Sequence, residues 1–147
     1  ALAAALADTA QALCRPAKLH FVLQEQWQGQ FLCAAPGLSR ALENMLDNAV
    51  RYTPAGGTVT LTISKADGDV AFTVADTGPG FTPEALHKAG QFLYTDTARP
   101  DNGHQGLGLY LARSVARAHG GNLIVSNDPA AHGARTELRL PICTNAL

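Results

Sequence analysis

The chain has 147 residues, 46% of them hydrophobic, which fits one globular domain with a core of its own. Its 11 basic and 12 acidic side chains give a formal net charge of -1, so no overall field attracts nucleic acid or an anionic membrane, and a bound polyanion would be held locally. No apolar run approaches the ~20 residues that span a bilayer. Three cysteines without CxxC spacing argue against a disulfide framework or a zinc site and favour a reducing compartment.

The first half of the chain predicts two helices and two short extended segments. Apolar residues at helical spacing predict a helix over residues 2–13 that ends before Pro16. The segments LHFVLQ and GQFLCA follow as extended pieces. A second helix is predicted over residues 38–52, and Pro54 ends it. One apolar stripe marks this helix, formed by Leu38, Leu42, Met45, Leu46, Ala49 and Val50.

The second half predicts two pairs of strands around a helix. TVTLTISKADGDVAFTVAD predicts a hairpin with its turn at residues 66–68. Residues 82–105 fit one helical turn and then lose periodicity, and an irregular segment this long inside a compact domain is more often a functional lid than a connector. A helix over residues 107–118, closed by Gly120 and Gly121, precedes the strands NLIVSND and GARTELRLP. The sum is an α+β fold with helices packed on a sheet.

Three polar side chains of the helix over residues 38–52 lie in one line. Asn44, Asn48 and Tyr52 are spaced i, i+4, i+8 beside the apolar stripe. This line can be the polar flank of an ordinary helix. Alternatively it binds a metal ion, because a carboxamide oxygen is a hard ligand suited to Mg²⁺, which relies on a substrate's phosphates for further ligands.

Two turns contain pairs of glycines. DTGPG closes the second strand of the hairpin, and Asp76 there is either a turn former or a carboxylate that accepts from a ligand's amino group while the glycines let the ligand approach. HQGLGL places Gly106 and Gly108 at a helix start, which is either a plain N-terminal turn or an anion site. The spacings of the dinucleotide-binding and Walker motifs are missing.

In this order, the motifs resemble the catalytic and ATP-binding domain of a sensor histidine kinase, within the superfamily that also holds gyrase, the Hsp90 chaperones and the MutL repair proteins. ENMLDNAVRYTP resembles the family's N box, DTGPG its first glycine box, HQGLGL its second and GARTEL its closing glycine-threonine element. Because these motifs order nearly the whole chain, residues 1–147 are expected to form one such domain, cut from a longer protein. The resemblance implies a Bergerat-type two-layer α+β sandwich, with a mixed sheet covered by about three helices and a long ATP lid.

The resemblance implies that the N box binds Mg-ATP. Asn48 would coordinate the Mg²⁺ that bridges the ATP phosphates, and Asn44 would contact phosphate or metal-bound water. Arg51 would face the phosphates, and Tyr52 would cover the adenine ring. ATP-hydrolysing members of the superfamily carry a general-base Glu where this chain has Asn44, and an amide cannot take a proton at neutral pH. A phosphotransfer domain with slow intrinsic hydrolysis is therefore expected.

The first glycine box and the closing element would bind the base. Asp76 would accept a hydrogen bond from the adenine amino group, with Gly78 and Gly80 allowing the approach. Thr136 would close the pocket behind the base.

The second glycine box would bind the phosphates through the backbone N–H groups of Gly106, Leu107 and Gly108. The family usually has a glycine where His104 stands in this chain. His104 is therefore either an exposed lid histidine or a further phosphate contact.

The phosphoaccepting histidine of this family sits on a dimerisation helix and is followed by an acidic residue, and none of the 5 histidines here is followed by one. The domain is therefore expected to donate the γ-phosphate of ATP to a histidine on a separate dimerisation domain, with a response regulator downstream, and to phosphorylate nothing in cis. The resemblance also implies a monomeric fragment of a homodimeric parent, a cytoplasmic location beneath a bacterial inner-membrane sensor, and no nucleic-acid partner.

Two alternatives remain open. An anti-sigma-type serine kinase has the same fold, although the helix over residues 2–13 and the RYTP ending of the N box disfavour it. A degenerate nucleotide-binding module that only regulates a partner is disfavoured by intact Asn48, Asp76, Gly106 and Gly108, while the altered lid keeps it open.

Overall fold

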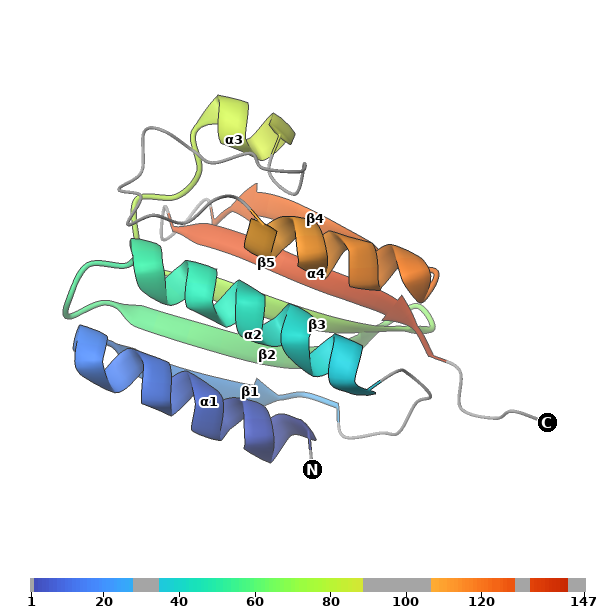
Figure 1. Ribbon diagram of the computed structural model, residues 1–147, viewed down its shortest axis with the longest axis horizontal. Helices are drawn as coiled ribbons and strands as arrows, with labels where there is room; N and C mark the ends of the chain where they lie inside the picture. The colour runs from blue at the N-terminus through green and yellow to red at the C-terminus, as the bar shows by residue number, and fades with distance from the viewer. Residues whose placement is uncertain (1, 28–34, 89–106, 129–132, 143–147) are drawn as a thin grey trace.

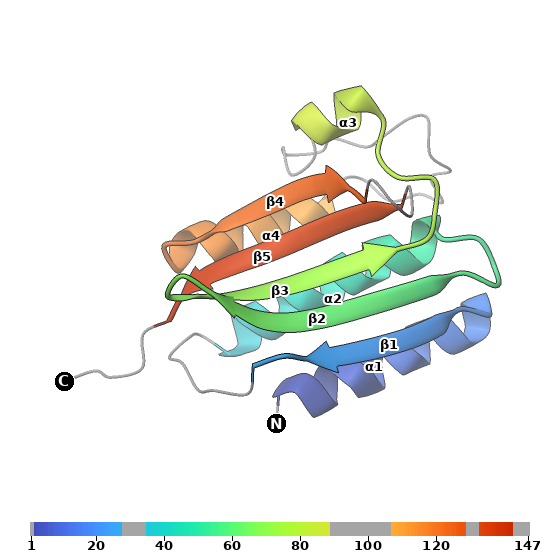
Figure 2. The ribbon, with the colours of Figure 1, turned by 180° about the vertical axis from the view of Figure 1, so that it is seen from behind.

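The computed structural model describes residues 2–27, 35–88, 107–128 and 133–142, which form one five-stranded sheet and four helices. In chain order the elements are α1 (Leu2–Ala17), β1 (His20–Glu25), α2 (Ala35–Tyr52), β2 (Thr58–Ala66), β3 (Asp69–Asp76), α3 (Pro83–Lys88), α4 (Leu107–Ala118), β4 (Asn122–Asn127) and β5 (Ala134–Pro141). The long helices α1, α2 and α4 cover one face of the sheet, and the strands stand in front of them when the molecule is seen from behind (Figures 1 and 2). The expected two-layer α+β sandwich with about three covering helices is confirmed.

The sheet is mixed, with the strand order β1-β2-β3-β5-β4. β1 pairs with β2 in parallel, and all other pairs are antiparallel. The predicted hairpin is present between β2 and β3, where Asp67 and Gly68 have φ angles of 51° and 86°. Two consecutive residues with positive φ match the twist of the flanking strands, which explains why Asp-Gly forms this turn.

Helix α1 differs from its prediction, because it passes through Pro16 and ends at Ala17. A cap closes it there: the N–H of Lys18 donates to the carbonyl of Arg15, and the N–H of Leu19 donates to that of Cys14. Lys18 has a φ of 59°, the left-handed conformation that such a cap needs. Pro16 therefore costs α1 little more than a hydrogen bond in its last turn.

Helix α4 ends as predicted. Gly120 has a φ of 78°, its N–H donates to the carbonyl of Arg117, and the N–H of Gly121 donates to that of Ala116. This is the same cap in its usual form, with glycine at the left-handed position.

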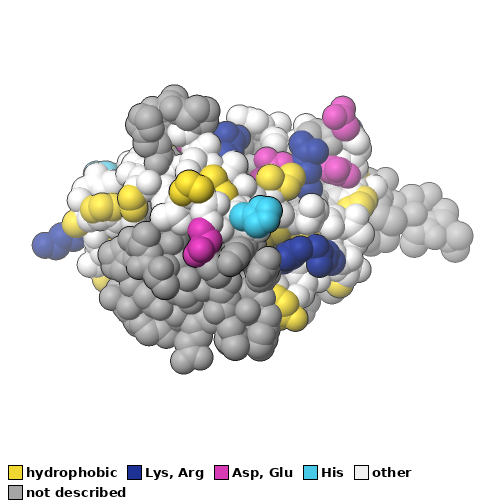
Figure 3. Space-filling view, turned by 90° about the horizontal axis from the view of Figure 1, so that it is seen from above, with side chains coloured by type: hydrophobic (Ala, Val, Ile, Leu, Met, Phe, Trp, Pro, Cys, Tyr) yellow, Lys and Arg dark blue, Asp and Glu magenta, His cyan; other side chains and the backbone are white. Residues whose placement is uncertain are grey.

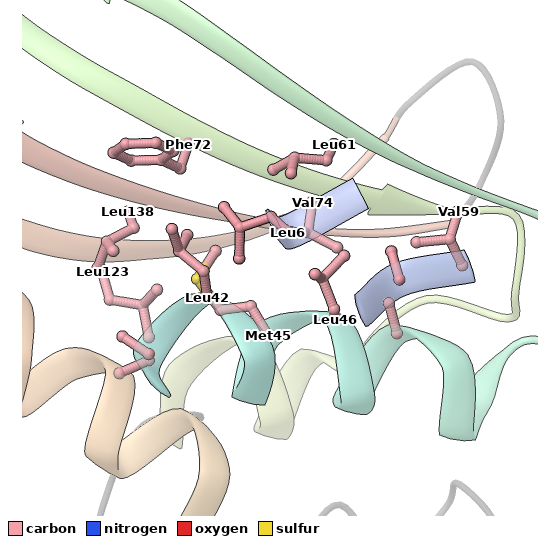
Figure 4. Packing of buried hydrophobic residues seen from close by; sticks show 14 of the residues in the cluster. Leu6, Leu42, Met45, Leu46, Val59, Leu61, Phe72, Val74, Leu123 and Leu138 are labelled. Carbon is pink, nitrogen blue, oxygen red and sulfur yellow. The ribbon is translucent and has the colours of Figure 1, made fainter. Parts of the chain in front are cut away.

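The core lies between the helices and the sheet face that they cover. Leu6 of α1 and Leu42, Met45 and Leu46 of α2 point at this face (Figure 4), whereas Val50 of the predicted stripe is only partly buried. The largest fully buried side chains are Phe72, Leu6, Leu38, Leu42, Met45, Leu46, Leu61, Leu138, Leu140, Val59, Val70 and Val74. The predicted stripe of α2 is therefore the centre of the core, and its burial fixes which polar residues of α2 lie at the edge.

Helix α3 is the predicted helical turn and stands apart from the three covering helices (Figure 1). The rest of the expected lid and the segment GQFLCA lie outside the described residues. Seen from above, basic, acidic and hydrophobic side chains of the described residues are intermixed (Figure 3), in keeping with the net charge of -1. No helix among the described residues is long and apolar enough to cross a membrane.

Candidate nucleotide-binding site

Helix α2 positions the polar line Asn44, Asn48 and Tyr52 as its spacing predicts. Asn48 is 6% exposed and Tyr52 is 7% exposed, so both side chains are almost enclosed at the end of the helix. The Nδ2 atom of Asn44 is buried and donates to nothing in the described part of the chain. A buried amide donor without a partner is costly and points to an acceptor other than the described residues.

The end of α2 lies directly against the loop after β3. A Cβ atom on Gly78 would lie 2.7 Å from the carbonyl oxygen of Tyr52 and 3.1 Å from the Oδ1 atom of Asp76. Any side chain at Gly78 would therefore push the loop away from the helix. The structure thus brings the N-box residues of α2 and the first glycine box together, and Gly78 is required by the packing of the protein before any ligand is considered.

Asp76 ends β3 as a buried carboxylate that is 4% exposed. Its Oδ1 atom accepts hydrogen bonds from the N–H of Gly78 at 2.8 Å and from the N–H of Ala134 at 3.2 Å. Burying a charge is tolerated only where polar partners replace water, and here two backbone donors do so. The carboxylate is thereby held in one place at the end of the sheet.

Gly133 and Ala134 of the closing element GARTEL approach Asp76, whereas the sequence singled out Thr136. Ala134 supplies the second N–H, and a Cβ atom on Gly133 would overlap the carbonyl oxygen of Asp76. Thr136 is 4% exposed and lies opposite Val74, two residues further along the strand. The glycine of GARTEL was the available signal for this contact, because a glycine before a strand often marks a close backbone approach.

Gly80 and Phe81 complete the loop, which is named the 76–81 loop below. Gly80 has a φ of 79°, so a glycine is favoured there by the backbone itself. The N–H of Phe81 donates to Oδ1 of Asn127 at 2.7 Å, and Nδ2 of Asn127 donates to the carbonyl of Phe81 at 2.9 Å. Nothing in the sequence pattern singled out Asn127.

Arg51 supplies the positive charge next to the polar line. One of its terminal nitrogens lies 3.3 Å from Oδ2 of Asp47, four residues earlier on α2. Its Nε atom is buried and has no hydrogen-bond partner among the described residues. A guanidinium that is tethered at one end and has an unused donor is suited to bind a phosphate oxygen.

The N-terminus of α4 lies at the same end of the molecule as the end of α2. Leu107 and Gly108 are the first residues of α4, which packs along α2 in the opposite direction, so that α4 begins at the end of the molecule where α2 and β3 end (Figures 1 and 2). His104 and Gly106 lie outside the described residues. Of the residues that the sequence predicted for the site, the structure describes Asn44, Asn48, Arg51, Tyr52, Asp76, Gly78, Gly80, Leu107, Gly108 and Thr136.

Comparison with known proteins places this arrangement in a family. Residues 33–144 match the family of histidine kinase-, DNA gyrase B- and HSP90-like ATPases. The sensor histidine kinase SpaK of Bacillus subtilis is 41% identical over 107 residues, which make up 71% of this chain and 23% of SpaK. The sensor protein QseC of Escherichia coli strain K12 is 43% identical over 90 residues, 61% of this chain and 19% of QseC. The chain spans about a fifth of the length of the curated relatives it matches.

Solved structures agree with the sequence matches. The mycobacterial sensor histidine kinase MprB superposes with a TM-score of 0.84 at 27% identity over 95% of both chains. Full-length ShkA in complex with AMPPNP superposes with a TM-score of 0.83 at 28% identity over 99% of this chain and 30% of ShkA. Fold and site thus define an ATPase domain of the Bergerat type. The chain belongs to the family of histidine kinase-, DNA gyrase B- and HSP90-like ATPases, and within it to the ATP-binding catalytic domains of two-component sensor histidine kinases.

Proposed function

We propose that the chain binds Mg-ATP between α2, the 76–81 loop and the start of α4, and that the γ-phosphate passes to a histidine on a dimerisation domain. The observation that carries this proposal is the buried carboxylate of Asp76, fixed by two backbone N–H groups beside the end of α2. A carboxylate held in this way is a preorganised acceptor for the amino group of adenine. The same carboxylate would favour adenine over bases that carry a carbonyl oxygen in place of this amino group.

The residues of α2 fit a magnesium ion bound together with nucleotide phosphates. The carboxamide of Asn48 offers a hard oxygen ligand. The Nδ2 atom of Asn44, which has no partner among the described residues, would donate to a phosphate oxygen or a metal-bound water. When bound, Mg²⁺ neutralises charge on the phosphates during phosphoryl transfer. Arg51 would add its unused Nε donor to the phosphate chain.

Transfer to a protein acceptor is favoured over hydrolysis by the groups of α2. The amide of Asn44 cannot remove a proton from water at neutral pH. Glu43, the neighbouring carboxylate, is exposed on another side of the helix, about 100° around its axis. Water in the site would therefore lack a general base at the position of Asn44, where the ATP-hydrolysing members of the superfamily carry a glutamate, while a protein acceptor brings its own nucleophile.

The names of the relatives support the remaining proposals about the parent protein. SpaK and QseC are named as sensor proteins, and MprB of Mycobacterium leprae is named as a signal transduction histidine-protein kinase/phosphatase. We therefore propose a homodimeric membrane sensor with this domain in the cytoplasm, a histidine-bearing dimerisation domain as phosphate acceptor, and a response regulator downstream. Residues 1–147 would be one monomeric catalytic domain of that parent.

Titration with ATP, with and without Mg²⁺, tests the assignment of the metal ligand. Asn48→Ala is expected to remove most of the gain in ATP affinity that Mg²⁺ gives, about tenfold in Kd or more, because the metal loses its protein ligand. Glu43→Ala, an exposed change on the same helix, is the control and should behave as the wild type. An equal gain from Mg²⁺ in the wild type and in Asn48→Ala would remove Asn48 from the metal site.

Mixing the ATP-loaded chain with a separately made dimerisation domain tests the reaction. Transfer of the γ-phosphate to the histidine of that domain supports the kinase. Tight binding of ATP without transfer supports the regulatory module instead. Labelling of this chain by itself would contradict the expectation that it phosphorylates nothing in cis.

A further inference from the structure

Asn127, the last residue of β4, binds the backbone of Phe81 with both ends of its carboxamide. Its Oδ1 atom accepts from the N–H of Phe81 at 2.7 Å, and its Nδ2 atom donates to the carbonyl of Phe81 at 2.9 Å. A carboxamide has one acceptor and one donor side, so it pairs with a residue's N–H and C=O as a neighbouring strand would. Asn127 thus continues the pairing of the sheet beyond the end of β4.

These two bonds fix the far end of the 76–81 loop. Its near end is held by β2, because the N–H of Thr77 donates to the carbonyl of Thr58 and the N–H of Thr58 donates to Oγ1 of Thr77. Phe81 itself is 7% exposed and belongs to the core. The loop is therefore fastened to β2 at its near end and to the last residue of β4 at its far end.

The same strand end also reaches Asp76. Asn127 pairs with Ala134 across β4 and β5, and the N–H of Ala134 donates to the carboxylate of Asp76. The paired residues Asn127 and Ala134 therefore contact both ends of the 76–81 loop: the side chain of Asn127 binds Phe81, and the backbone of Ala134 binds Asp76. Between them, Gly78 must stay in contact with the carbonyl of Tyr52.

We propose that Asn127 is a positioning residue for adenine recognition. It touches no nucleotide, and it acts by holding the 76–81 loop at the place where Asp76 and Tyr52 face the same base. The inference rests on the proposed function and extends it to a residue outside the motifs. Without the two hydrogen bonds, the loop spends part of its time away from α2, and the apparent affinity for nucleotide falls with the fraction that stays in place.

The test compares Asn127→Ala and Asn127→Asp with Asn122→Ala. Asn122 is the same residue type at the other end of β4, where its side chain accepts from the N–H of Leu123 next to it. Asn127→Ala is expected to raise the Kd of ATP and of ADP by the same factor, about tenfold, because the base is common to both. Asn127→Asp keeps an acceptor for the N–H of Phe81 but sets a charged oxygen against the carbonyl of Phe81, where two acceptors repel, and it should raise both Kd values at least as much as Asn127→Ala. Asn122→Ala should leave both affinities unchanged.

Amide hydrogen exchange separates positioning from a general loss of stability. Asn127→Ala should speed exchange at the amide of Phe81 while the amides of β2 and β3 keep the protection that they have in the wild type. Faster exchange throughout the sheet, or a rise in the Kd of ATP but not of ADP, would overturn the proposed role. If Asn127→Ala does not fold, Asn127→Asp decides by the same two measurements.

Wild-type binding separates this inference from the function on which it rests. Binding of ATP by the wild type with unchanged affinity in both Asn127 variants overturns the role of Asn127 alone. Failure of the wild type to bind ATP overturns the proposed function, and the role of Asn127 falls with it.

Discussion

Replacing Asp76 by asparagine changes one oxygen of a buried side chain to an amide nitrogen and leaves its shape the same. The remaining oxygen can still accept from the N–H groups of Gly78 and Ala134, which now lie 2.8 and 3.2 Å from Oδ1. The amide group must turn its NH₂ away from these two donors, because a donor cannot pair with a donor. The substitution therefore keeps the loop in place and puts a donor where the proposed adenine contact needs an acceptor.

The expected loss of affinity follows from the burial of this group. A hydrogen bond to a charged acceptor contributes about 1.5–3 kcal/mol, and Asp76 is only 4% exposed, so water screens it little. A loss of about 2–3 kcal/mol corresponds to an increase of roughly 30- to 150-fold in the Kd of ATP. The two retained backbone bonds lose their charge assistance, which should cost about 1 kcal/mol of folding stability and lower the Tm by roughly 2–4 °C.

Calorimetric titration with ATP and with inosine triphosphate measures the effect. Inosine carries a carbonyl oxygen in place of the adenine amino group, so the wild type should prefer ATP, and Asp76→Asn should lose most of that preference. Asp69→Asn, the same substitution at the other end of β3, is the control. An unchanged ATP affinity in a folded Asp76→Asn variant would refute the assignment of the base to this carboxylate.

Two further predictions concern stability. Leu42→Ala, at a position that is 0% exposed, should lower the free energy of unfolding by about 2–5 kcal/mol. Leu111→Ala, at a position that is 42% exposed, should change it by less than about 0.5 kcal/mol. Urea denaturation of both variants measures the two values, and a larger loss in Leu111→Ala would contradict the described packing. Burial raises the pKa of the Cys14 thiol above its ordinary value of 9.0. Because the folded-state pKa is the higher one, this thiol's contribution to stability is constant below about pH 9 and falls as the pH rises through the folded pKa. Denaturation of the wild type and of Cys14→Ser between neutral and alkaline pH should show this decline in the wild type only, and parallel curves would contradict it.

Some elements of the fold were predictable because their cause is local. Asp67 and Gly68 form a hairpin turn through their own tolerance of positive φ, and Gly120 ends α4 for the same reason. The spacing of Asn44 and Asn48 places them on one side of a helix whatever the helix packs against. Each of these predictions depends on residues within a few positions of one another.

Helix α1 shows where local rules were insufficient. A proline normally ends a helix, but in α1 the backbone of Lys18 takes a φ of 59° and allows a cap two residues beyond Pro16. A lysine is uncommon in that conformation, so its sequence carries no signal for it. The N–H of Gly56, from a distant part of the chain, donates to the carbonyl of Lys18 and supports this conformation.

The sequence by itself determined which side chains are candidates for the proposed site: two carboxamides, a phenol, a guanidinium and a carboxylate, each on a helix or strand whose type the local pattern predicts. Only the tertiary structure decided how they are held. Ala134 binds Asp76 across 58 positions of the chain, and Asn127 binds Phe81 across 46. One partner in each contact is a backbone N–H or C=O group, which nearly every residue type carries alike, so the residue pattern does not name that partner, and Gly133 signals only that a backbone approaches closely. Which backbone groups meet depends on the register of β3, β4 and β5, and that register is set by burying one face of the whole sheet against α1, α2 and α4.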